Sequence, residues 1–351
     1  MKISKNSSGN SNSPDWSKLS DEELLELRMN KIALPWENSP IAPYCQQLLS
    51  ELSQKEIRFK PEFYVGDEWC NPEGSNAISI PFYLTHQRLE ELEKNMMLEV
   101  EGGNPKDCMM LLRHECGHAF DAAFKLSKKR DWRKTFGDPN KSYQPDSYQP
   151  HPFSKKFVQY LDNWYAQSHP EEDFAETFAV WLDPEIDHNN KYKKNPHIQL
   201  KLNFVEKYAQ KYSKDLTHIK NSYLLGKVSR LKKSLKRHYQ EKKKLLAEEY
   251  PAFYDEDLCH IFSRERPKQL VAIKAEKFLR KSKKHIVNSV AYWTGQKKFN
   301  VERLVRRLIL RCQTLDLWVD KSTETTNFEV AAFLSNLLTN YQFTGKFRRT
   351  V

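Results

Sequence analysis

Residues 114–118 read H-E-C-G-H, which has the form H-E-x-x-H and suits metal-assisted hydrolysis when it lies on a helix. Residues four positions apart lie one helical turn above each other, so His114 and His118 can reach the same ion. Zinc lowers the pKa of a bound water toward neutrality, and Glu115 lies beside the histidines to take a proton from that water. The five-residue pattern also arises by chance, so its surroundings decide what it means.

The surroundings of the motif favour a metal site. The pattern predicts a helix over residues 106–126, because Asn104 and Pro105 form a cap and a first-turn proline. Apolar residues flank the motif on both sides, from Met109 to Leu112 before it and from Ala119 after it. Histidine and glutamate side chains inside so apolar a helix cost free energy unless they find partners.

A catalytic zinc takes three protein ligands, so a third must come from elsewhere in the chain. No third histidine follows at the short spacing of the metzincins, and Asp121 comes too soon. Residues 171–183 (EEDFAETFAVWLD) predict a second helix with Glu172 and Glu176 four apart on one face. We expect Glu172 to bind the metal and Glu176 to accept the free N–H of a ligating histidine. The alternatives are a dipole-stabilised first-turn carboxylate for Glu172 and an intrahelical ion pair for Glu176.

Two further residues are candidates for supporting roles. Asp121 falls on the face of the histidines and could orient one of them. Tyr165, seven residues before Glu172, could donate a hydrogen bond to the oxyanion of a tetrahedral intermediate. His151 and His169 are rival donors, and an aromatic residue on an amphipathic helix is more often part of the core.

The runs RHECGHAFD and WYAQSHPEEDFAETFAVWL resemble the bacterial putative zinc-binding metallopeptidase family and, more widely, gluzincins. The resemblance covers residues 36–212 and extends weakly beyond them. In the lethal-factor-like branch of gluzincins a catalytic tyrosine precedes the ligand glutamate and a second glutamate follows four residues on, as Tyr165, Glu172 and Glu176 do here.

The resemblance implies peptidase activity with one catalytic Zn²⁺, His114, His118 and Glu172 as ligands, and Glu115 as general base. It also implies an α+β, zincin-like core, in which a small sheet lies over the active-site helix and an edge strand binds extended peptide. Residues 76–84 are the counterpart of that strand, and Pro81, which cannot donate to a ladder, suits an edge.

The elements that must position the site are mainly helical. We expect helices over residues 43–56 and 85–100, strands over 57–65 and 76–84, and an irregular loop over 128–152. Helices over 154–167, 171–183 and 197–212 should follow. Beyond them the pattern predicts a long basic helix over 224–250 and helices within 251–263, 268–285, 300–318 and 326–341.

Charge divides the chain unevenly. Residues 213–351 carry 30 Lys and Arg against 14 Asp and Glu, a net +16, whereas residues 1–212 carry 27 against 32, a net −5. We therefore expect a disordered tail (1–15), a zincin-like metallopeptidase domain (16–212) and a basic, mainly helical C-terminal region (213–351). The basic residues of that region form two groups: Lys232, Lys233, Lys236, Arg237 and Lys242–Lys244, then Arg303, Arg306 and Arg307.

These basic groups leave two alternatives to a general peptidase open. One is a catalytically vestigial, zinc-bound regulatory or nucleic-acid- or anion-binding protein, since such patches bind phosphates. The other is a processing enzyme that docks one acidic substrate. Solvated helix faces are the commoner explanation of such patches.

Composition bounds the location. Hydrophobic residues make up 39% of the 351, and no apolar run of about eighteen residues exists, which argues against a membrane span. The six cysteines form no C-x-x-C pair, and the N-terminus lacks the apolar stretch of a secretory signal. We expect reduced thiols and, by default, a cytoplasmic location.

Overall fold

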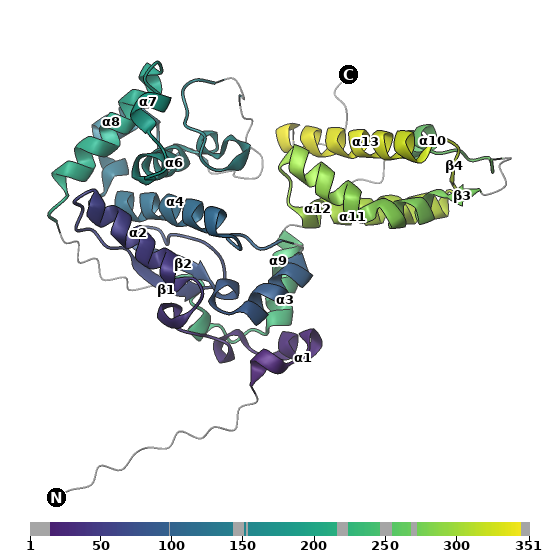
Figure 1. The fold of residues 1–351 in the computed structure, drawn as a ribbon, viewed down its shortest axis with the longest axis horizontal. Coiled ribbons are helices and arrows are strands. Elements are labelled where there is room, and N and C mark those ends of the chain that lie inside the picture. Colours follow the sequence, from purple (N-terminus) through teal and green to yellow (C-terminus); the bar gives the residue numbers. More distant parts are fainter. Residues whose placement is uncertain are drawn as a thin grey trace, which may run out of the picture.

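The structure, a computed structural model, describes residues 15–97, 99–142, 151, 154–215, 224–245, 255–267 and 272–344. Within them the fold is mostly helical, with two sheets of two strands each (Figure 1). This confirms the expected helical C-terminal region and a small sheet against the helix that carries the motif. The expected tail, apart from Asp15, lies outside the described residues.

Helix α4 (Pro105–Phe124) carries H-E-x-x-H through the middle of the first core. It begins as expected, because the Asn104 side chain accepts a hydrogen bond from the N–H of Asp107 at 3.0 Å. Helix α4 packs against α6 (Pro170–Leu182), α2 (Ala42–Gln54) and strand β2 (Ala77–Pro81) (Figure 1). A Cβ atom at Gly117 would lie 2.8 Å from the Cα of Ala175, so glycine is what lets α4 and α6 approach so closely.

Strands β1 (Glu62–Gly66) and β2 pair in parallel, with Tyr64 opposite Ser79. Both are shorter than expected, and residues after Pro81 form a 3-10 helix, η4 (Phe82–Thr85). The connection between the strands returns along the other side of β2, where Cys70 forms an antiparallel bridge with Ser79. Ser79, in the middle of β2, therefore lies between Tyr64 of β1 on one side and Cys70 of the β1–β2 connection on the other.

The remaining elements of this part show two departures from expectation. The loop expected over residues 128–152 contains helix α5 (Arg130–Phe136). The helix expected over residues 154–167 is wrong, because only its end is helical, as 3-10 helix η6 (Asp162–Gln167). Backbone groups of residues 156–161 instead meet buried side chains of α6 and α8, described below. The other helices of this part are α1 (Asp21–Glu26), α3 (Gln87–Met97), α7 (His188–Lys191) and α8 (Pro196–Lys211).

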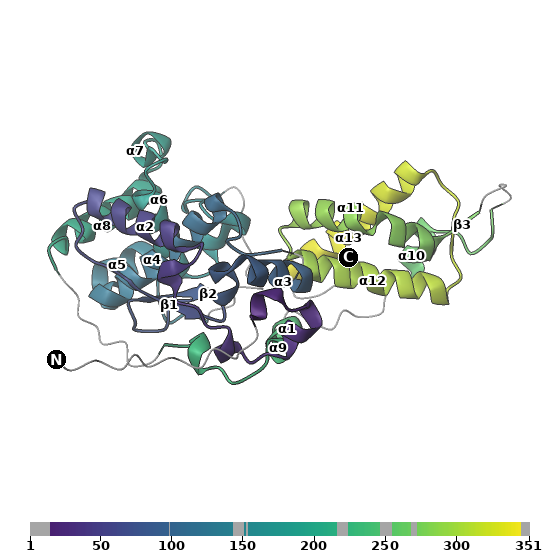
Figure 2. The same cartoon turned by 60° about the horizontal axis from the view of Figure 1, so that its bottom comes forward.

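Residues 224–245 pack with the first core. The expected long helix is, within the described residues, a 3-10 turn η7 (Val228–Arg230) and helix α9 (Leu235–Leu245). Val228, Leu235 and Tyr239 belong to the same buried cluster as α4 and α6. Helix α9 lies beside α1 (Figure 2). The boundary at residue 212 stays a prediction, although these contacts join α9 to the preceding part.

A second buried cluster is formed by four helices, α10 (Asp255–Ile261), α11 (Ala275–Thr294), α12 (Lys298–Thr314) and α13 (Thr323–Thr344). Strands β3 (Ile273–Lys274) and β4 (Trp318–Val319) form a short antiparallel pair beside them. The helix expected over 268–285 begins only at Ala275 within the described residues. Across the described part of the chain, no helix is long and apolar enough to cross a membrane.

Candidate metal centre

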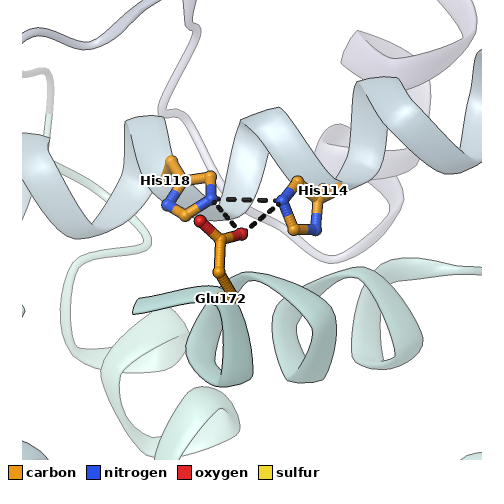
Figure 3. A group of neighbouring side chains, drawn as sticks. All are labelled: His114, His118 and Glu172. Carbon is orange, nitrogen blue, oxygen red and sulfur yellow. Dashed lines mark hydrogen bonds and ion pairs between the residues drawn. The ribbon is translucent and has the colours of Figure 1, made fainter. Parts of the chain in front are cut away.

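Three predicted ligands converge between α4 and α6 (Figure 3). His114 Nε2 lies 3.0 Å from Glu172 Oε2, and His118 Nε2 lies 3.1 Å from the same oxygen. The two Nε2 atoms are 3.1 Å apart. The tertiary structure thus brings together residues 54 and 58 positions apart, as a site for one ion requires.

The donor atoms fit a zinc ion. His114 Nδ1 lies 3.1 Å from Glu176 Oε1, and a carboxylate accepts, so the ring proton belongs on Nδ1. The lone pair of Nε2 then faces Glu172 and His118, so a metal ion or a proton between these acceptors would satisfy them. Donors about 2.0–2.1 Å from a tetrahedral zinc lie about 3.3 Å from each other, close to the separations found here. The residues present are therefore compatible with a zinc site.

The electrostatics of the cluster also call for positive charge. Burial alone would lower the pKa of His114, but hydrogen bonds to Glu172 and Glu176 raise it to about 10. Burial would raise the pKa of Glu172, yet His118 and His114 hold it well below its usual range. When no metal ion is present, a proton on a histidine stabilises the carboxylates. A bound divalent ion would supply positive charge at the same place.

Glu115 lies on α4 next to the ligands and is buried. Burial raises the pKa of this carboxyl, and the nearby His118 and His114 only partly offset the effect. A carboxyl whose pKa is moved toward neutrality can both accept and release a proton in one reaction cycle. Its position and its electrostatic environment suit the predicted role of general base.

Glu176 lies where the sequence predicted an orienting residue. Its side chain is fully buried, and Oε1 faces His114 Nδ1. The other oxygen, Oε2, accepts backbone hydrogen bonds from Tyr160 at 3.1 Å and Leu161 at 2.9 Å. The carboxylate is thereby held at both ends, which is what fixing the ring of a ligand requires.

Tyr165 lies on η6, close to the cluster. Its ring centroid is 5.7 Å from that of His114. The preceding residue, Trp164, adopts a φ of +54°, in the left-handed region that non-glycine residues rarely enter. Such backbone conformations concentrate at functional sites, where the surrounding structure enforces them. The role of Tyr165 stays a prediction.

The two rival donors differ in what is described of them. His169 is the N-cap of α6: its Nδ1 accepts from the N–H of Glu171, and its Nε2 lies 3.1 Å from the carbonyl oxygen of Lys141. His151 is exposed, and its backbone pairs with the side chain of Gln167. The ring contacts of His169 favour Tyr165 over that histidine, and the choice between Tyr165 and His151 stays open.

Asp121 has a structural contact at the end of α4. Its Oδ1 accepts a hydrogen bond from the backbone N–H of Ser127 at 2.7 Å. Burial raises the pKa of Asp121 to about 6, and the hydrogen bonds from Ser127 oppose that rise. This contact stabilises the turn after α4, and an orienting role toward a histidine stays a prediction.

Sequence reasoning missed a buried network next to the site. Arg113 donates to both oxygens of Glu51, at 2.7 and 2.8 Å, and to Asp183 Oδ2 at 2.7 Å. It also donates to the Tyr160 hydroxyl at 3.0 Å. Two signals in the sequence could have revealed this network. Arg113 follows the apolar run before His114, and Glu51 lies on a predicted amphipathic helix that packs on the core.

The outer edge of β2 is occupied by its own connecting segment. The N–H of Ser79 donates to the carbonyl oxygen of Cys70 at 2.9 Å, and the carbonyl oxygen of Ala77 accepts from Asn71 Nδ2 at 2.6 Å. The N–H of Ala77 donates to Ser75 Oγ at 3.0 Å. As expected, β2 lies at an edge of its two-stranded sheet, but the connecting segment already occupies the hydrogen-bonding groups of Ala77 and Ser79 on that edge. Peptide binding along this strand stays a prediction.

The predicted basic patch on residues 232–244 is partly neutralised within the chain. Its lysines form ion pairs with acidic residues from the N-terminal part of the chain, namely Lys236 with Glu26, Lys233 with Asp67, and Lys242 with Glu68 and Glu93. The positive charge of α9 thus compensates the acidic front of the chain. These pairs favour the interpretation as a structural helix face.

Comparison with protein families gives a match over residues 106–238 to the family described as putative zinc-binding metallo-peptidase. Comparisons with curated proteins and with solved structures give no match. The matched segment begins at the start of α4, contains all three proposed ligands and ends within α9. Residues 106–238 thus carry the pattern of the putative zinc-binding metallo-peptidase family, which confirms the resemblance drawn from the two motifs.

Proposed function

We propose that this protein is a zinc-dependent peptidase of the gluzincin type, which hydrolyses peptide bonds in a protein or peptide substrate. The observation that carries the proposal is the convergence of His114, His118 and Glu172 at 3.0–3.1 Å, beside a buried Glu115. A second helix that brings a glutamate to an H-E-x-x-H helix supports a zincin-like core.

His114 Nε2, His118 Nε2 and a Glu172 oxygen would hold the metal ion, and Glu176 would keep the His114 ring in place. When bound, zinc supplies a Lewis acid and lowers the pKa of water at its open position. This ligand set can also take other divalent ions in vitro, so zinc is the proposed ion on grounds of ligand chemistry and family.

Glu115 and Tyr165 would carry out the steps assigned to side chains. The Glu115 carboxylate accepts a proton from the attacking water and then donates it to the nitrogen of the leaving amine as the C–N bond breaks. The Tyr165 hydroxyl donates a hydrogen bond to the oxyanion that forms on the carbonyl oxygen of the substrate. Its closeness to the His114 ring supports this assignment.

A nucleic-acid-binding function has weaker support. Of the basic groups that motivated it, Lys233, Lys236 and Lys242 pair with Glu26, Asp67, Glu68 and Glu93. In the second group, Arg306 pairs with Glu302. Ion pairs with the protein's own carboxylates reduce the charge available to phosphates. We therefore keep the peptidase as the single proposed function.

The test compares wild type with Glu115→Gln in bound zinc and in cleavage of a peptide library. We expect about one zinc ion per chain in both and a loss of cleavage of about 10²–10⁴-fold in the variant. Glu185→Gln, on the exposed end of the segment after α6, is the matched control and should cleave like wild type. An unchanged cleavage rate in Glu115→Gln contradicts the mechanism.

A further inference from the structure

We propose that Tyr160 is a positioning residue of the metal centre, which holds the backbone of residues 160–161 against Glu176 and thereby fixes the ring of His114. This inference rests on the proposed zinc site. Tyr160 is separate from the three ligands and from Glu115, so it acts through other residues. Its hydroxyl anchors the segment to Arg113 and Asp183, and its backbone N–H donates to Glu176.

The first step links the backbone to the ligand. Glu176 Oε2 accepts from the N–H groups of Tyr160 and Leu161, and Oε1 faces His114 Nδ1. Two N–H donors on one oxygen fix the rotation of the carboxyl group, so the place of the other oxygen follows from the backbone. The orientation of the His114 ring therefore depends on where residues 160–161 lie.

The second step concerns what holds that backbone. Residues 156–161 are not helical, so helical hydrogen bonds do not fix them. The buried Tyr160 hydroxyl donates to Asp183 Oδ2 at 2.9 Å and accepts from Arg113 Nη1 at 3.0 Å. The same Nη1 donates to Asp183 Oδ2 at 2.7 Å, which closes a triangle of hydrogen bonds around the tyrosine.

The third step shows that the anchors are themselves fixed. Arg113 is bound by both oxygens of Glu51 and directly precedes His114 on α4. At the other end of the segment, Lys201 Nζ donates to the carbonyl oxygen of Lys156 and to Asp173 Oδ2, both at 2.6 Å. Buried charged groups thus hold the segment at both ends, and the Tyr160 side chain is the anchor at the end that contacts Glu176.

The experiment is Tyr160→Phe in the full chain, which removes only the hydroxyl. Zinc affinity is measured by competition with a chromophoric chelator, and the visible spectrum of the cobalt(II)-loaded protein reports ligand geometry. We expect zinc binding about 3- to 10-fold weaker than in wild type, together with a shifted cobalt spectrum. This loss of affinity is smaller than the loss expected when a direct hydrogen-bond partner of a ligand is removed. A role confined to stability would change neither readout in the folded protein.

The matched control is Tyr208→Phe. Tyr208, on α8, is also buried and donates to an aspartate, Asp131 Oδ2, at 2.7 Å. Its aspartate lies on α5, and the described hydrogen bonds of this pair do not reach Glu176 or residues 160–161. Urea unfolding of both variants gives their stability, and zinc affinity should fall only in Tyr160→Phe. Equal zinc affinity and an identical cobalt spectrum in Tyr160→Phe and wild type overturn the inference.

A double-variant cycle tests the route through Glu176. If Tyr160 acts through that carboxylate, Tyr160→Phe should weaken zinc binding much less in a Glu176→Gln background than in wild type. An equal loss in both backgrounds overturns this route. A wild-type chain that binds no zinc overturns the proposed function itself, which distinguishes that failure from a failure of the Tyr160 inference.

Discussion

The two buried clusters of the molecule differ in what they bury. The cluster around α4 and α6 adjoins buried ionisable side chains, including His114, Glu172, Glu176, Arg113 and Lys201. The bundle of α10 to α13 buries mainly aliphatic side chains and, among its described residues, one carboxylate, Glu302. Burying charge costs free energy unless every charge is paired, so a protein keeps such groups where they serve a purpose. The comparison supports placing the proposed metal site in the first cluster.

Helix α9 shows that packing and charge divide the chain differently. By charge it belongs to the basic C-terminal half, but its Leu235 and Tyr239 lie in the first cluster. Its lysines pair with carboxylates of that same part. We propose that the boundary between the two parts lies between residues 246 and 254, after α9, in place of residue 212.

The largest expected effect is loss of the metal. His114→Ala removes one of three ligands and the contact to Glu176, so bound zinc should fall from about one ion per chain to near zero. His285→Ala, an exposed histidine on α11 of the second bundle, should keep it. Metal analysis after dialysis measures both. Zinc retained in His114→Ala, or lost in His285→Ala, would break the assignment of the site to the first cluster.

Truncation tests the proposed boundary. A chain ending at residue 250 keeps Val228, Leu235 and Tyr239 in the first cluster, so it should fold and bind zinc. A chain ending at residue 212 loses these side chains and the ion pairs of Lys242, so it should unfold or aggregate. Circular dichroism and zinc content are the measurements. Equal behaviour of the two truncations would return the boundary to residue 212.

Arginines in the two parts should differ in their contribution to stability. Arg113→Met leaves Glu51 and Asp183 buried without their cation, so the free energy of unfolding should fall by about 3–5 kcal/mol. Arg311→Met breaks an ion pair with Asp255 on the surface of the bundle and should cost less than about 1 kcal/mol. Urea unfolding measures both losses. Similar losses would contradict the difference between the two parts.

The smallest effect is a pH dependence from α9. Burial, with the charges of Lys233 and Lys242, lowers the pKa of His238 to about 3. The unfolded chain, with an ordinary pKa of about 6.5, takes up a proton that the folded chain refuses, so stability from this group is present above pH 6.5 and lost as pH falls. Between pH 7 and 5 wild type should lose roughly 2 kcal/mol more than His238→Gln. Parallel unfolding curves at the two pH values would contradict this linkage.

The sequence by itself determined the helices that carry the proposed site and the spacing of its candidate ligands. The expected ranges 106–126 and 171–183 agree closely with α4 and α6, because local signals set them: the Asn104 cap, the first-turn prolines and the apolar periodicity. The i, i+4 spacing of His114 and His118 and of Glu172 and Glu176 placed each pair on one face, since helical geometry is local.

Only the tertiary structure decided how these pieces are held. Residues 156–161 have a helical pattern but are not helical, because Glu176 and Lys201 take their backbone groups. Arg113 contacts residues 47 to 70 positions away, and Cys70 bridges to the edge strand that Pro81 predicted. Such contacts follow from how elements pack, and no periodicity along the chain records them. The local pattern thus named the proposed metal ligands, and the packing of α4, α6 and the segment between them brings those side chains together.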